Sequence, residues 1–412
     1  MSGIKSDTAI KLPISFILCA LVAFVTSLFI LLVNSQELLA GQFRFPEIWM
    51  GAHFLLLGFA VMIAMGAMYQ LVPVAFLTPI WNQSFGFVQF YVTVVGIIFL
   101  SIMLGINPSL AIYGGILTVI GILMFTFQML KTLAKRKENT AMSHLVLAAI
   151  LCFLLTILAG LSLTWNFAFG GMANHSSILY SHIAFGVAGW FTLLIFGFSY
   201  KLVPMFSLSH GASMKRAKPS FYMYVFGLLL LILSFWLNQS FIQPLSWLFL
   251  LIGFGLFALD IKEILTKRLR RKLDKPFHFA TLAIINGWVI HVAAFFISLF
   301  HIDDPVIWSW LIFLYIFCWI IFSILGYLFK IVPFLWWTHK YAERIGKESV
   351  PTLKEMINEK VSGYLFIVFY VALFGILIST SIQSGVTLFF FLAILTVNGL
   401  LYALSIVAVL FK

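Results

Sequence analysis

Three copies of one pattern decide the fold of this chain: Gly66-Ala-Met-Tyr-Gln-Leu-Val-Pro73, Gly197-Phe-Ser-Tyr-Lys-Leu-Val-Pro204 and Gly326-Tyr-Leu-Phe-Lys-Ile-Val-Pro333. Each copy closes a long apolar stretch, and the interval from one proline to the next is almost constant along the chain. Proline has no backbone N–H to donate, so we expect a helix to end or kink at each copy. A pattern at a nearly fixed interval indicates a repeated architecture. We place three tandem units at about 1–137, 138–272 and 273–412.

The composition places the chain in a membrane. Of its 412 residues, 63% are hydrophobic and 9% are charged, which is more apolar surface than a soluble domain can bury. An apolar stretch of about 20 residues is long enough to cross a bilayer as a helix. The sequence therefore predicts an all-α polytopic membrane protein, one membrane domain in which about twelve transmembrane helices form three pseudo-repeated four-helix units. The expected spans are 12–34, 47–72, 87–104, 109–130, 142–164, 178–204, 220–238, 244–261, 278–300, 306–333, 361–380 and 385–411.

The positive charge reports the orientation of these spans. The net charge is +12, and in the twelve-span arrangement only Arg44 of the 25 Lys and Arg residues faces outward. Because basic residues accumulate in cytoplasmic loops, we expect both termini in the cytoplasm and the chain in the cell (plasma) membrane. Its expected partner is the lipid bilayer, and nucleic acid is not expected.

Few chemical groups are available within the membrane. Asp260 lies at the inner end of one span, and Glu47, Asp303 and Asp304 lie at the outer rim. A proton pump places carboxylates at mid-membrane, so this distribution argues against one. The three cysteines lie in apolar stretches, and no CxxC motif is present. An extracellular disulfide framework is therefore excluded, as are structural zinc and c-type heme attachment through cysteine.

Histidines in the outer half of the membrane are the candidate ligands. His53, His182 and His291 lie within expected spans, and the first and third are about 10 Å and about 13 Å deep at 1.5 Å per residue. Neutral imidazole binds Fe, Cu and Zn, and histidine is a common axial heme ligand. Alternatively, each is a single polar residue hydrogen-bonded between helices. His182 stands two positions farther from its repeat proline than His53 does from its own. Either a bulge intervenes in one of the two helices, or the two histidines face different helix–helix interfaces.

The repeat and the histidines together resemble a known superfamily. Twelve spans in three units, with outer-half histidines on spans 2 and 6, resemble the heme–copper oxidase catalytic subunit (subunit I). Within it, His53-Phe-Leu-Leu-Leu-Gly-Phe59 and His182-Ile-Ala-Phe-Gly-Val-Ala-Gly189 are most similar to the NnrS family. The resemblance implies bound heme and copper and a role in the nitric oxide response. It places His53 at a low-spin heme position and His182 at the span-6 metal position.

The chain departs from the oxidase pattern in two spans. Neither 220–237 nor the tenth span contains histidine, so the usual copper site and heme pair of an oxygen reductase lack their ligands. We therefore expect the chain not to be a competent oxygen reductase. Whether it catalyses any other reaction is left open.

Three functions fit these observations. The first is a heme-binding membrane protein, with copper as a second cofactor, in redox or nitric oxide stress physiology. Its cofactor ligands would be His53, His182 and His291, with His182 and His291 as metal ligands, and its partner would be a redox protein or respiratory complex. The second is a cofactor-free assembly or interaction subunit that keeps the oxidase scaffold. The third is a membrane transporter, although common transporter folds show twofold repeats. Bound heme, co-purification with an oxidase without heme, or solute uptake would distinguish them.

Overall fold

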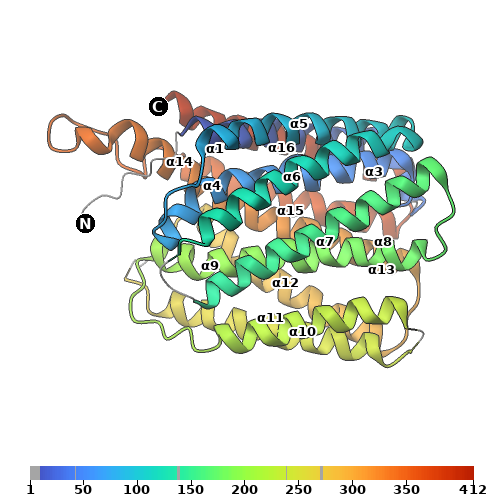
Figure 1. The fold of residues 1–412 in the computed structure, drawn as a ribbon. Coiled ribbons are helices and arrows are strands. Elements are labelled where there is room, and N and C mark those ends of the chain that lie inside the picture. Colours follow the sequence, from blue (N-terminus) through green and yellow to red (C-terminus); the bar gives the residue numbers. More distant parts are fainter. Residues whose placement is uncertain (1–9, 42, 137–139, 238, 270–271) are drawn as a thin grey trace. The chain divides into compact units, whose positions relative to one another are not determined.

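The computed structural model describes residues 10–41, 43–136, 140–237, 239–269 and 272–412 (Figure 1). Within these ranges the chain is helical and has no named strand, and two isolated bridges join single residues. Eleven of the described helices are long and apolar enough to cross a membrane. The prediction of an all-α polytopic membrane protein is confirmed. The expected span 244–261 falls in the 25-residue helix Ile242–Thr266, which is not among the eleven, so the count of twelve remains a prediction.

The chain divides into two compact units rather than into three consecutive ones. Unit 1 comprises Met1–Lys137, Asp274–Phe277 and Ile324–Lys412, and unit 2 comprises Glu138–Leu273 and His278–Ser323. The three tandem repeats are neither confirmed nor contradicted by this division, because it follows spatial packing and not internal similarity. The repeat boundaries remain a prediction.

Unit 1 is organised around its first helix. Helix α1 packs against α3, η1, α4 and α16, and Phe24 of α1 stacks on Phe59 of η1 with ring centroids 4.5 Å apart. Two further pairs, α5 with α6 and α15 with α16, pack as hairpins. The elements are α1 (Lys11–Val33), α2 (Ser35–Leu39), α3 (Pro46–His53), η1 (Phe54–Val61), α4 (Met62–Phe76), α5 (Gln83–Ile106), η2 (Pro108–Leu110), α6 (Ala111–Leu133), most of α14 (Phe322–Tyr341), η5 (Ala342–Arg344), α15 (Glu359–Ser381), α16 (Gly385–Val407) and η6 (Ala408–Phe411).

Unit 2 is organised around α7, which packs against α8, η3 and α9. Helices α10 and α11 form a hairpin in which α10 also packs against α8 and α11 packs against α9. The elements are α7 (Ala141–Phe169), α8 (His175–Ala184), η3 (Phe185–Phe191), α9 (Thr192–Ser207), α10 (Ala217–Trp236), α11 (Ile242–Thr266), most of α12 (Lys275–Leu299), α13 (Pro305–Leu314) and η4 (Tyr315–Ile321).

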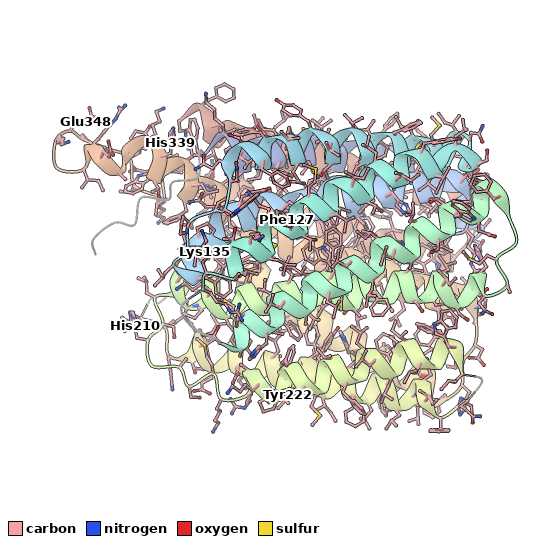
Figure 2. The ribbon with its side chains drawn as sticks, in the orientation of Figure 1. Phe127, Lys135, His210, Tyr222, His339 and Glu348 are labelled. Atoms are coloured by element: carbon pink, nitrogen blue, oxygen red, sulfur yellow. The ribbon has the colours of Figure 1, made fainter. Side chains whose placement is uncertain are left out.

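Glycines bring the helices of two hairpins into backbone contact. Figure 1 shows α5 beside α6 and α10 beside α11. A Cβ atom built on Gly114 would lie 2.3 Å from the backbone nitrogen of Leu100, and one on Gly253 would lie 2.7 Å from that of Tyr224. Small residues at such crossings allow close van der Waals packing, which drives helix association in lipid. The other faces carry exposed aromatic side chains such as Phe127 and Tyr222 (Figure 2).

A π-helical segment interrupts the helix that carries each repeat pattern. These segments, η1, η3 and η4, begin at nearly the same position relative to the repeat prolines, Pro73, Pro204 and Pro333. A π turn pairs each N–H with the carbonyl five residues earlier, so it inserts extra chain into an α-helix and shifts the helix face beyond it. The three segments therefore recur at the same place as the sequence pattern, which supports a common local structure.

None of the three helices ends at its proline. Helices α4 and α9 continue for three residues, and Leu77 and Leu208 then end them in the left-handed conformation, with φ of 52° and 54°. The proline carbonyl remains an acceptor, and it receives the N–H of the capping leucine in both helices. Helix α14 continues past Pro333 to Tyr341. Of the two expectations, a helix end at the proline was wrong by about one turn in two helices and two turns in the third, because losing one donor leaves the downstream bonds intact. A kink at the proline stays a prediction.

Candidate functional site

His291 is the most deeply buried of the predicted ligands. It lies on α12 with no exposed surface, and its Nδ1 lies 2.7 Å from the carbonyl oxygen of Gly287. Because a carbonyl only accepts, Nδ1 carries the proton of this bond and Nε2 carries a lone pair. Nε2 faces the hydroxyl of Tyr224 at 3.4 Å, a long hydrogen bond. The imidazole is thus held in one tautomer with an acceptor nitrogen directed at a phenol.

Four aromatic rings enclose this imidazole within unit 2. The ring of Phe254 lies 4.5 Å from that of His291, Tyr315 lies at 5.3 Å, and Tyr224 and Trp247 each lie at 5.9 Å, centroid to centroid. Among the residues that the structure describes, the buried indole N–H of Trp247 has no hydrogen-bond partner. An unsatisfied buried donor is costly, and a small molecule that accepts a hydrogen bond would satisfy it.

A chain of buried hydroxyls continues from Tyr224 to Tyr315 and Thr192. The Tyr224 hydroxyl lies 3.0 Å from that of Tyr315, which lies 2.8 Å from Oγ1 of Thr192. Thr192 donates its one proton to the carbonyl of Val187 at 3.0 Å, and it accepts from the indole N–H of Trp319 at 3.0 Å. Tyr315 must therefore donate to Thr192, so Tyr224 donates either to Tyr315 or to His291.

The two π segments of unit 2 hold this chain of hydroxyls. Thr192 directly follows η3, Val187 lies within η3, and Tyr315 opens η4. The bond from Thr192 to a carbonyl five residues earlier follows the π spacing. We call His291, Tyr224, Tyr315, Thr192 and Trp319 the buried network; each is at most 4% exposed.

His182 lies on α8, three residues before η3, and it is half-buried. Its Nδ1 donates to the carbonyl of Thr156 on α7 at 2.9 Å. A Cβ atom built on Gly160 would lie 2.9 Å from Cε1 of His182, so the imidazole occupies the space that a larger residue at 160 would fill. The glycine therefore allows His182 to reach the backbone of the neighbouring helix.

His53 is the last residue of α3, directly before η1 in unit 1, and it is half-buried. Its Nδ1 donates to the carbonyl of Trp49 in the same helix at 2.8 Å. The acceptor is thus one turn earlier in its own helix, whereas His182 donates to another helix. All three predicted ligands share one arrangement, with Nδ1–H on a backbone carbonyl and the lone pair on Nε2. Metal-ligating histidines are commonly oriented in this way.

A metal centre formed by several side chains is not seen in the described part of the chain. No three His, Cys, Asp or Glu side chains there lie close enough to hold one ion. His182 contacts α7, whereas His291 contacts residues of α10, α11 and η4. Heme is a different case, because the porphyrin supplies four ligands and the protein needs to supply only one or two.

Sequence reasoning found His291 but missed its partners. Tyr224, Tyr315 and Thr192 are uncharged residues of apolar spans, and Thr192 and Tyr315 lie 123 positions apart in sequence. A uniform hydropathy signal does not separate such residues from lipid-facing ones. A scan against protein-family models gives no match for this chain, and no curated protein matches it significantly.

Proposed function

We propose that this chain is a heme-binding integral membrane protein with an architecture like that of heme–copper oxidase subunit I, most similar to NnrS, in redox or nitric oxide stress physiology. One observation carries the proposal. His53 and His182 each lie one to three residues before a π segment of a pattern-bearing helix, with Nδ1–H donated to a backbone carbonyl. The chemistry of these donors fits an axial heme ligand, because it leaves the lone pair on Nε2.

His53 in unit 1 and His182 in unit 2 would each hold heme iron through Nε2. Bound heme supplies electron transfer and the binding of diatomic gases. The protein contributes imidazoles in a fixed tautomer, and the small residue Gly160 leaves room for the imidazole of His182.

His291 is the third proposed ligand, for copper or for a cofactor-bound molecule. Its Nε2 lies 3.4 Å from the hydroxyl of Tyr224, and the indole of Trp247, whose N–H has no partner among the described residues, lies beside the imidazole. A lone pair on Nε2 and a buried indole N–H without a partner suit a small polar ligand. Four rings within 5.9 Å leave little room for a porphyrin beside this imidazole.

The proposed topology follows from the same architecture. Twelve spans in three units would place both termini and the basic loops after α6, α9, α11 and α14 in the cytoplasm of a plasma-membrane protein. The recurrence of a π segment and a proline pattern in α3–α4, α8–α9 and α13–α14 supports the threefold repeat. A redox protein or respiratory complex is the partner that a heme protein of this kind requires.

An optical spectrum of the detergent-purified protein, oxidised and reduced, with iron and copper measured per chain, tests this function. We expect a Soret band with near-stoichiometric iron. His53→Ala and His182→Ala should each lower the heme content, whereas His210→Ala, in the exposed loop after α9 (Figure 2), should not. Unchanged heme in both variants would refute the ligand assignment, and a colourless, iron-free protein from heme-replete cells would refute heme binding.

A cofactor-free scaffold is the second candidate, favoured by the buried network. Each hydroxyl of that network already has a protein partner, so its tyrosines need no ligand to satisfy their hydrogen bonds. Such a subunit would co-purify with an oxidase or reductase complex without carrying heme. The spectrum separates the two candidates, because only the first gives a Soret band.

A further inference from the structure

The chain after α9 is folded back onto the end of α11 in unit 2. Leu208 ends α9 with φ of 54°, and its carbonyl accepts the N–H of Leu269 at 3.2 Å. Ser209 forms an isolated bridge with Arg268, and its hydroxyl donates to the carbonyl of Ile264 at 2.7 Å. Two segments that are far apart in sequence, one after α9 and one at the end of α11, therefore form one surface.

Two carboxylates of α11, Asp260 and Glu263, accept hydrogen bonds from residues of this surface. Glu263 accepts hydrogen bonds from Lys267 at 3.1 Å, from the hydroxyl of Ser213 at 3.0 Å and from Arg216 at 3.0 Å. Arg216 also donates to Asp260 at 3.0 Å. The bonds from Lys267, from the Ser213 backbone and from Arg216 lower the pKa of Glu263 to about 2, so this carboxylate is ionised at neutral pH. Its negative charge is directed at the loop and is not available to an external cation.

Other cations of this surface make no ion pair with Asp260 or Glu263. Lys215, Lys218 and Lys262 are exposed, and none makes an ion pair with a described residue. Arg268 is exposed, and its guanidinium donates to the carbonyl of Leu265. We call residues 208–218 together with residues 262–269 the basic platform.

Exposed apolar side chains accompany these cations. Leu208 is 53% exposed and Leu269 is 73% exposed, and the two residues are joined by a backbone hydrogen bond. Residues 208–218 of the platform directly follow a helix of membrane-spanning length, His175–Ser207, so they begin at the level where a candidate span ends. Leucine beside lysine and arginine at that level suits a headgroup region, where apolar groups reach the acyl chains and cations reach phosphate.

We propose that the basic platform binds the headgroups of anionic phospholipids. Three lysines that make no ion pair with a described residue supply the charge, and the two leucines insert beside the acyl chains. Asp260 and Glu263 hold Ser213 and Arg216, which flank Lys215 in the loop. Clusters of basic residues next to a membrane helix attract anionic lipid, and the attraction is screened by salt. This inference is independent of heme binding.

Lipid binding to the purified full-length protein in neutral detergent tests the proposal. Short-chain phosphatidylglycerol and phosphatidylcholine of equal chain length are titrated, and bound lipid is counted by native mass spectrometry. We expect tighter binding of phosphatidylglycerol. The triple change Lys215→Gln, Lys218→Gln and Lys262→Gln should weaken it by roughly 100-fold at low salt.

Two controls make the test specific. The change Lys347→Gln, Lys354→Gln and Lys360→Gln removes the same charge from exposed lysines elsewhere and should leave binding within about threefold. Changing the three platform lysines to arginine keeps the positive charge and should preserve lipid binding. This variant therefore shows that substitution at these positions does not itself unfold the protein. Equal binding of the two lipids, an equal loss in the control triple variant, or displacement of phosphatidylglycerol by equimolar inorganic phosphate would overturn the proposal. Tighter binding of a polyanionic peptide than of the lipid would also overturn it.

Discussion

Tyr315→Phe removes one hydroxyl from the centre of the buried network and tests whether that network stabilises unit 2. The hydroxyl makes two hydrogen bonds, to Thr192 at 2.8 Å and to Tyr224 at 3.0 Å, and the residue is 4% exposed. Hydrogen bonds between membrane helices contribute on average about 0.6 kcal/mol and at most about 1.7 kcal/mol each. Two bonds therefore amount to about 1.2 kcal/mol, with an upper limit of about 3.4 kcal/mol.

The structure favours the lower part of this range. Thr192 keeps its bonds to Val187 and Trp319, and Tyr224 keeps His291 as an acceptor. Neither remaining partner is left wholly unsatisfied, so the large penalty of an orphaned buried group does not apply. We expect Tyr315→Phe to reduce the free energy of unfolding by about 1 kcal/mol.

Unfolding in mixed micelles with increasing SDS measures this difference. Tyr222→Phe is the matched control, because Tyr222 is 63% exposed on α10 and packs against Phe221 (Figure 2). It should change stability by less than about 0.5 kcal/mol. Equal effects of the two variants would refute the claim that the network is stabilising. In the Thr192→Val background Tyr315→Phe should cost less, since one of its bonds is already lost.

Three further predictions concern other contacts. Gly114→Ala places a methyl group 2.3 Å from the backbone nitrogen of Leu100, so it should destabilise the α5–α6 hairpin. In the same SDS assay the free energy of unfolding should fall by about 1–3 kcal/mol. Gly160→Ala should displace His182 from its carbonyl acceptor and reduce the free energy of unfolding by about 1 kcal/mol. In a His182→Ala background Gly160→Ala should cause no such loss, and an equal loss in both backgrounds would contradict this explanation. The low pKa of Glu263, about 2 against an ordinary 4.5, means that its contribution is present above about pH 4.5 and is lost as pH falls toward 2. Glu263→Gln should therefore lower the thermal midpoint at pH 7 and have a much smaller effect near pH 2, and an equal effect at both would contradict this.

The spans could be predicted because hydropathy determines them. The expected stretch 142–164 lies within α7, and 178–204 lies within the continuous helix His175–Ser207. Lipid cannot satisfy exposed backbone groups, so an apolar run of this length must be helical. The ends were less predictable, since the capping box of Thr140 and Ser143 and the left-handed Leu208 extend helices by local hydrogen bonds.

The candidate site was only partly predictable, and for a physical reason. A histidine in an apolar span is conspicuous, so His291 could be selected from the sequence alone. Its partners Tyr224 and Tyr315 are chosen by tertiary packing, which a single sequence does not encode in any local pattern. The interhelical bond of His182 depended on a glycine at position 160, and that glycine was not distinguished from the other small residues of α7.

The π segments bear on the unequal registers of His53 and His182. His182 stands two positions farther from its repeat proline than His53 does, and two residues turn an α-helix by about 200°. A bulge corrects such a difference only if it falls between the histidine and the proline in one helix and not in the other. Both helices carry a π segment after the histidine, and η1 and η3 begin at the same position relative to Pro73 and Pro204, so the correction cancels. We therefore expect the two imidazoles to leave their helices on different faces. Their hydrogen bonds also differ, because His53 donates to its own helix and His182 donates to α7. If both bind heme, they do so as inequivalent ligands, and His53→Ala and His182→Ala should alter different spectral features.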